Sequence, residues 1–159
     1  MRTRSRNRRE SAASARTSWP INIEVTESPS ARAISDLVGF QVAQCVVDSG
    51  VSLVLSRGQQ SALLRIEGLF RLRLDGDWEL DPSGDRSSLG PSLKLFGRAI
   101  ESAKLLPSGE LEIVLTGDAW LLLYRGRDYE AWTLNLPGNV LVVSGTDGEI
   151  SVFRERGTS

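Results

Sequence analysis

The chain of 159 residues contains no histidine and only one cysteine, Cys45. Without histidine there is no imidazole to act as a general base, to activate a serine or cysteine nucleophile, or to bind a metal. One cysteine can form neither a zinc cluster nor an internal disulfide, which is typical of a reducing compartment. We therefore expect a cytoplasmic protein with no metal site and no catalytic residues, in which Cys45 is a buried, inert side chain.

Long apolar runs and phosphate-binding loops are also missing. The longest apolar run has six residues, at 119–124, whereas a membrane-spanning helix needs about 20. No apolar stretch follows the basic N-terminus, so the sequence does not predict a secretory signal. Neither glycine-rich nucleotide-binding motif is present. These absences predict a protein that is not an enzyme, binds no cofactor and does not cross a membrane.

Positive charge is concentrated at the start of the chain. The first 16 residues contain six arginines and one glutamate, a net charge of +5, so the other 143 residues carry −6 of the total of −1. Residues 1–18 lack apolar periodicity, and we expect a disordered basic arm, whose composition also resembles a transit peptide. One domain is expected over 19–159. The arm would bind nucleic acid only weakly, through arginines that neutralise phosphates: Arg2, Arg4, Arg6, Arg8 and Arg9.

Apolar residues alternate with polar ones through most of the domain. The segments 51–55, 62–66 and 70–74 each place apolar side chains on one face, which is typical of half-buried antiparallel strands. Short helical turns are predicted at 29–38 and from Pro91. Connections are too short for the crossover helices of a parallel sheet. The pattern predicts a mainly β fold, an antiparallel barrel or sandwich of nine or ten short strands.

The two halves of the domain resemble each other. Leu-Val-Gly at 37–39 matches Leu-Phe-Gly at 95–97, and 53–56 matches 113–116 at an offset of 60 rather than 58. The pattern predicts two related halves, about 29–80 and 91–153, in which 37–67 and 95–126 superpose about a pseudo-twofold axis. Gly39 and Gly97 should then both have the left-handed conformation that glycine adopts at little cost.

An acidic run follows the third predicted strand. Its carboxylates occupy every second position, so an extended strand would place them on one face, with Trp78 and Leu80 on the other. Three interpretations are open: a solvated strand face, an acidic recognition surface, or a catalytic carboxylate pair. The run consists of Asp75, Asp77, Glu79 and Asp81.

Four of the ten aromatic residues lie within thirteen positions: Trp120, Tyr124, Tyr129 and Trp132. Alternation places Glu130 on the same face as Trp132, so this carboxylate lies either at the wet end of a strand or beside a buried partner such as Arg125 or Arg127. The cluster is interpreted either as core aromatics with a structural ion pair or as the mouth of a pocket.

The C-terminal part also resembles a known group of proteins. Tyr129, Glu130 and Trp132 are followed by Gly138, the apolar run 141–144 and Gly-Glu-Ile at 148–150. This pattern is similar to an uncharacterised family of small β-rich actinobacterial proteins, in which a Tyr-Glu-x-Trp strand precedes a C-terminal hairpin. The resemblance covers about 37–153 and implies no catalytic residue. Such families are loosely similar to immunity proteins of toxin systems, which implies binding to another protein.

Two functional hypotheses follow. The acidic body and the missing catalytic residue types favour a non-catalytic interaction protein, of immunity type, that binds a basic protein partner, because complementary charge speeds association. The alternative is a β-barrel that binds a small molecule in a pocket lined by the aromatic cluster and Glu130.

Overall fold

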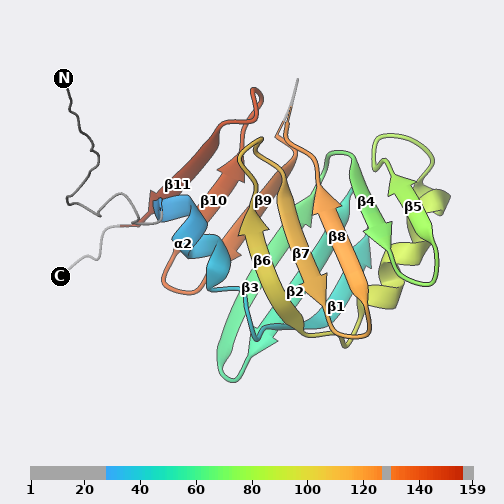
Figure 1. Ribbon diagram of the computed structural model, residues 1–159, viewed down its shortest axis with the longest axis horizontal. Coiled ribbons are helices and arrows are strands. Elements are labelled where there is room, and N and C mark those ends of the chain that lie inside the picture. Colours follow the sequence, from blue (N-terminus) through green and yellow to red (C-terminus); the bar gives the residue numbers. More distant parts are fainter. Residues whose placement is uncertain (1–27, 127–129, 156–159) are drawn as a thin grey trace, which may run out of the picture.

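The computed structural model describes residues 28–126 and 130–155, in which eleven strands form two antiparallel sheets (Figure 1). The six-stranded sheet has the order β1 (Gln41–Val47), β2 (Val51–Arg57), β3 (Gln60–Ile66), β9 (Trp132–Leu136), β10 (Val140–Ser144) and β11 (Ile150–Arg154). The five-stranded sheet has the order β5 (Asp77–Leu80), β4 (Phe70–Arg73), β8 (Ala119–Leu123), β7 (Leu111–Leu115) and β6 (Ile100–Leu105). The predicted mainly β fold is confirmed, as an open sandwich rather than a closed barrel.

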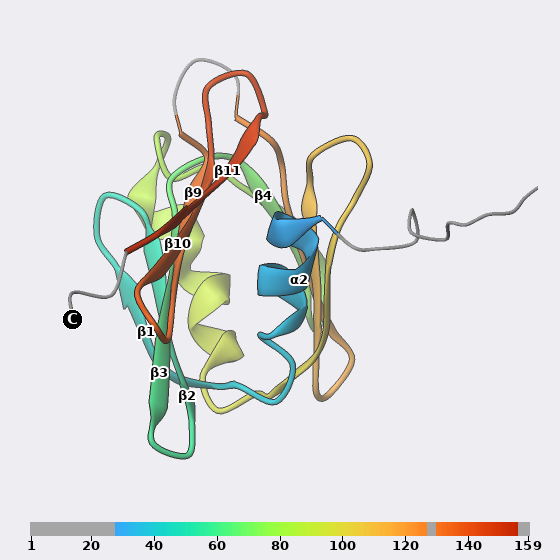
Figure 2. The same ribbon diagram turned by 90° about the vertical axis from the view of Figure 1, so that its left-hand side faces the viewer.

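Two short helices close the sides of the sandwich. Helix α2 (Pro29–Ser35) packs against β6 of one sheet and against β10 and β11 of the other, between the two layers (Figure 2). The 3₁₀ helix η4 (Arg86–Leu95) packs against β1 and β5, the edge strands of the opposite side. Each helix thus covers apolar side chains that lie between two edge strands.

Both helices begin at a side-chain cap, and their boundaries differ from the prediction. The Ser28 hydroxyl accepts a hydrogen bond from the amide of Ala31 at 3.1 Å, and α2 ends at Ser35 before the turn to Gly39. The Asp85 carboxylate accepts from the amide of Ser87 at 3.0 Å, so η4 begins at Arg86 rather than at Pro91. The helix therefore begins earlier than predicted, because this cap satisfies one of its first amides.

The two halves have the same strand order. In the first half, β1, β2 and β3 lie in the six-stranded sheet, and β4 and β5 cross to the five-stranded sheet. In the second half, β6, β7 and β8 lie in the five-stranded sheet, and β9 and β10 cross to the six-stranded sheet. Strand β3 of the first half pairs with β9 of the second half, and β8 of the second half pairs with β4 of the first. Each sheet therefore contains strands from both halves. Only β11 has no counterpart among the described strands.

The strand registers of the two halves also correspond. Val42 pairs with Leu55 and Ile100 with Leu115, and a β-bulge follows each of these pairs at the equivalent position. The predicted offset of 58 therefore applies to β1 and β6, and the offset of 60 to β2 and β7. Leu53 and Leu55, like Ile113 and Leu115, are buried in one core.

The halves meet where segments 39–42 and 97–100 run antiparallel. The Gly39 and Gly97 amides each donate a hydrogen bond to a carbonyl of the opposite segment, at 2.9 and 2.8 Å. One further amide of each segment also donates to a carbonyl of the other segment, and both of these hydrogen bonds measure 2.8 Å. Gly39 has φ of 93° and Gly97 of 84°, the related left-handed conformations that the sequence predicts. A pseudo-twofold axis therefore passes between the two segments.

Gly97→Val is expected to lower the free energy of unfolding by at least about 1 kcal/mol, because valine is strained at positive φ. A Cβ at Gly97 would meet no atom within 4 Å, so this loss reports backbone strain alone. Urea denaturation followed by circular dichroism measures it. Gly90→Val is the matched control, because that site is equally open and has no positive φ. Equal losses in the two variants would contradict the assignment.

The core lies between the sheets and extends under both helices. Its buried side chains alternate along the strands and include Ile34 of α2 and Leu89 and Leu95 of η4. No helix in the described part of the chain is both long and apolar enough to cross a membrane.

Candidate functional site

The outer face of the five-stranded sheet carries aromatic and charged side chains from four neighbouring strands. In β8, Ala119, Leu121 and Leu123 are buried, so alternation directs Trp120 and the following Tyr124 to the outer face. In β4 and β5, burial of the intervening residues directs the charged side chains outward in the same way. We call this set the outer-face cluster: Arg71, Arg73, Asp77, Glu79, Glu112, Trp120 and Tyr124.

Trp120 is the centre of the outer-face cluster. It lies directly opposite Arg73 of β4, whose guanidinium carbon is 4.3 Å from the centroid of the indole ring. On the other side, the indole Nε1 donates a hydrogen bond to Glu112 Oε2 of β7 at 2.9 Å. The ring is half-buried and is held by a cation over its face and a carboxylate at its edge.

Two further polar contacts extend the cluster to the edge strand β5. Arg71 donates from Nε and Nη2 to the two carboxylate oxygens of Asp77, at 2.8 and 2.7 Å. These hydrogen bonds hold the pKa of Asp77 below its usual range. The Tyr124 hydroxyl donates to Glu79 Oε2 at 3.3 Å, and partial burial together with this carboxylate raises the pKa of Tyr124. The cluster is thus a cross-strand network that keeps its aromatic side chains in fixed positions.

A family model matches residues 33–154, and its description is a family of unknown function, DUF6188. The chain belongs to this family. No curated protein and no solved structure matches the chain. The match includes both sheets and the whole outer-face cluster, and the predicted resemblance over 37–153 lies within it. The Arg-rich segment 1–18 lies outside the DUF6188 domain.

The acidic run is divided in the DUF6188 domain. Asp77 and Glu79 share the outer face, with Trp78 and Leu80 on the other side, as predicted. Asp75 lies in the preceding turn with φ of 56°, and Asp81 follows the strand and accepts from the amide of Ser83 at 3.0 Å. A single face for all four carboxylates is therefore wrong, because β5 extends only over 77–80.

The aromatic cluster is divided as well. Trp132 is 1% exposed and belongs to the core, whereas Trp120 lies on the outer face of the other sheet. Glu130 is exposed before the start of β9, which agrees with the interpretation that it lies at the solvent-exposed end of a strand. Tyr129 lies outside the described residues. Trp120 and Trp132 do not line one pocket. Trp120 and Tyr124 instead join Asp77 and Glu79, so that two separately predicted groups form one cluster.

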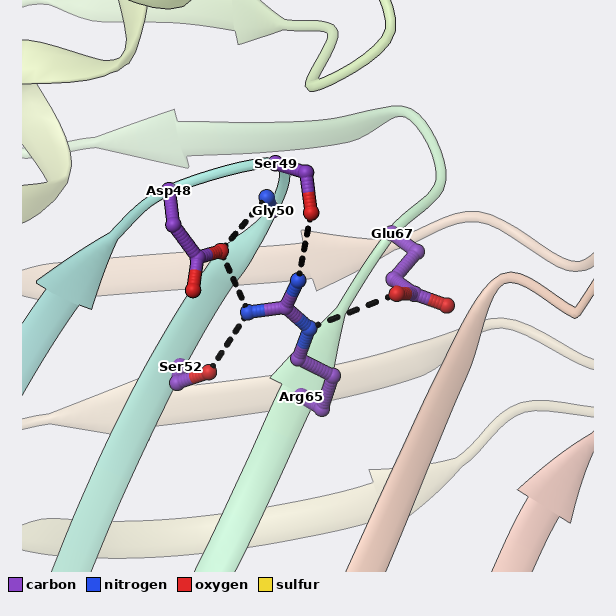
Figure 3. Close-up of polar contacts among 6 residues, drawn as sticks. All are labelled: Asp48, Ser49, Gly50, Ser52, Arg65 and Glu67. Carbon is purple, nitrogen blue, oxygen red and sulfur yellow. Dashed lines mark hydrogen bonds and ion pairs between the residues drawn. The ribbon is translucent and has the colours of Figure 1, made fainter.

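Sequence reasoning missed a polar network around Arg65 of β3 (Figure 3). The guanidinium donates to Asp48 Oδ1 at 2.7 Å, to Ser52 Oγ at 2.9 Å and to Ser49 Oγ at 3.1 Å, and Nε lies 3.4 Å from Glu67 Oε2. The hydrogen bond from Arg65 also lowers the pKa of Asp48. The Asp-Ser-Gly turn was recognisable in the sequence, but its partner depends on strand register.

Cys45 lies in β1 and is half-buried, with its thiol 3.4 Å from the carbonyl oxygen of Ser92. Burial raises the pKa of the Cys45 thiol, which disfavours the reactive thiolate. Within the described residues, no three histidine, cysteine or carboxylate side chains form a group able to hold a metal ion. The arrangement of the outer-face cluster is suited to stacking and hydrogen bonding.

Proposed function

We propose that the DUF6188 domain of this chain is a non-catalytic binding module and that its outer-face cluster contacts a protein partner. The observation that carries the proposal is the position of Trp120, half-exposed between Arg73 and Glu112. Tryptophan, tyrosine and arginine are the residue types most enriched where binding energy concentrates in protein interfaces. Here they lie together on one sheet face.

The cross-strand contacts support this role because they limit the motion of large side chains before binding. A partner would meet an indole ring already fixed by Arg73 and a phenol already fixed by Glu79. Association therefore costs less side-chain entropy than it would with freely rotating residues.

We propose further that the partner is a basic protein, bound in the manner of an immunity protein. The residues after position 16 carry a net charge of −6, which favours and accelerates encounter with a positively charged surface. The alternative, a pocket for a small molecule, has less support because Trp132 is buried in the core, whereas Trp120 lies on the outer face of the other sheet.

Trp120→Ala is expected to lower the recovery of a basic protein from lysate of the native cells by at least about tenfold, the effect of removing an interface hot spot. The full chain is immobilised and the retained proteins are quantified by mass spectrometry at low and high salt. Recovery should fall with salt, because complementary charge contributes to association.

Phe96→Ala is the matched control, since it also truncates an exposed aromatic side chain, 64% exposed after η4. This variant should retain the partner as the unchanged chain does. The proposal is wrong if no basic protein is recovered, or if its recovery is the same with Trp120→Ala as with Phe96→Ala.

A further inference from the structure

A second surface lies on the six-stranded sheet, at the end where β10 and β11 are joined. It is a hollow of about 270 Å³ whose apolar side chains are Val143 of β10 and Phe153 of β11. Phe153 is 56% exposed although it lies in a strand. Three carboxylate side chains also line the hollow: Glu130, Asp147 and Glu149. We call this surface the acidic hollow.

The acidic hollow has the chemistry of a site for a cationic side chain. Glu130, Asp147 and Glu149 are exposed, and none of them takes part in the ion pairs formed among the described residues. The described residues that line the hollow include no lysine or arginine, and the described arginine nearest its loop is Arg125, whose side chain lies against Gly148. A guanidinium can stack on an aromatic ring and can donate to carboxylates, and the lining of the hollow offers both kinds of side chain.

We propose that the chain's own Arg-rich segment docks in the acidic hollow through residues 1–16, which contain all of its arginines. The segment carries +5 and the hollow carries three carboxylates, so their charges are complementary. Because the segment is covalently attached, its effective concentration at the hollow can reach the millimolar range when the connection is long enough to span the distance. A separate basic molecule would have to exceed that concentration or bind more tightly.

The positions of the elements allow this contact. Helix α2, where the described part of the chain begins, packs against β10 and β11, the two strands that carry the hollow. The connection over residues 17–28 can extend to about 40 Å, whereas a five-residue strand such as β11 is about 17 Å long. The arginines can therefore reach the outer side of β11 from the start of α2.

This docking concerns a surface separate from the outer-face cluster, and it does not depend on the proposed function. It adds a device by which the chain restrains its own basic segment. Arginines held by carboxylates are less available to the phosphates of nucleic acid, which they would otherwise bind without sequence preference.

Paramagnetic relaxation measured on the full chain tests the docking. A nitroxide is attached at Ser11→Cys in a Cys45→Ser background, and amide peak intensities are compared with the label oxidised and reduced. At low salt we expect the intensities of Val143, Gly148 and Phe153 to fall to about half or less, because tethering favours the docked state. They should recover at about 0.5 M NaCl, where charges are screened within a few ångströms.

Two triple variants with the same change in net charge separate specific docking from general attraction. Neutralising the hollow with E130Q, D147N and E149Q should abolish the broadening. Neutralising three exposed acids elsewhere, with D75N, E101Q and D118N, should leave it unchanged; asparagine suits the positive φ of Asp75 and Asp118. The docking is refuted if broadening is absent at low salt or if both triple variants reduce it equally. Trp120→Ala should not affect it, so the result is independent of the proposed function.

Discussion

Replacing Trp132 with alanine should lower the free energy of unfolding by about 3–5 kcal/mol, a large part of the stability of a domain of this size. The Trp132 side chain is buried between the sheets, where β9 pairs with β3 on one side and β10 on the other. Its removal would leave a cavity that rigid strands on both sides cannot fill. Urea denaturation followed by circular dichroism measures the loss.

Trp120→Ala is the matched control, since it deletes the same side chain from the outer face of the other sheet. We expect this variant to lose under about 1 kcal/mol, the size of effect that a half-buried cross-strand contact contributes. If Trp120→Ala were the more destabilising of the two, the assignment of core and surface tryptophans would be contradicted.

Trp132→Phe should cost much less than Trp132→Ala. The indole Nε1 and the hydroxyl of its register partner Ser144 are buried without a hydrogen-bond partner among the described residues. In the first half, the equivalent register positions hold the apolar pair Phe70 and Leu80. Because phenylalanine removes an unsatisfied donor while keeping most of the apolar volume, we expect stability within about 1 kcal/mol of the unchanged chain.

Local periodicity predicted a mainly β fold, with nine or ten strands where the described residues form eleven. The echo between 37–39 and 95–97 reflects equivalent backbone positions at the pseudo-twofold axis, and Gly39 and Gly97 have the predicted conformation. The crossing of β4–β5 and β9–β10 into opposite sheets could not be predicted in the same way. Pairing of β3 with β9 joins residues about 70 positions apart, and no local pattern specifies such partners.

The candidate site was predictable only in parts, for a related reason. The run Ala119–Leu123 in β8 is apolar on both faces, so alternation alone did not show which face Trp120 would occupy. The faces are distinguished by neighbours: Arg73 and Glu112 lie beside Trp120 only after β4, β8 and β7 pair in their observed register. The network around Arg65 was missed for the same reason, because Asp48 and Ser49 lie in the β1–β2 turn and reach Arg65 only when β2 and β3 pair in their observed register.

Gly50→Ala should lower the free energy of unfolding by about 1–3 kcal/mol, because the added methyl group would overpack the turn beside Arg65. A Cβ at Gly50 would lie 2.6 Å from the carbonyl oxygen of Ile66 and 3.0 Å from the guanidinium carbon of Arg65. The first contact is with the backbone of the neighbouring strand, which cannot move without disturbing the β2–β3 pairing. Gly90→Ala is the control, because a Cβ there meets nothing within 4 Å.

Combining Gly50→Ala with Arg65→Met shows whether the turn and the guanidinium act together. Arg65 is only 21% exposed in its side chain and donates to Asp48, whose carboxylate also accepts from the Gly50 amide at 3.0 Å. Since either change displaces the same guanidinium from the same turn, the double variant should lose less stability than the sum of the two single variants. Additive losses in urea denaturation would mean that Arg65 stabilises β3 independently of the turn. A loss in the double variant that is smaller than the sum of the two single losses would show that the guanidinium holds the β1–β2 turn against the sheet.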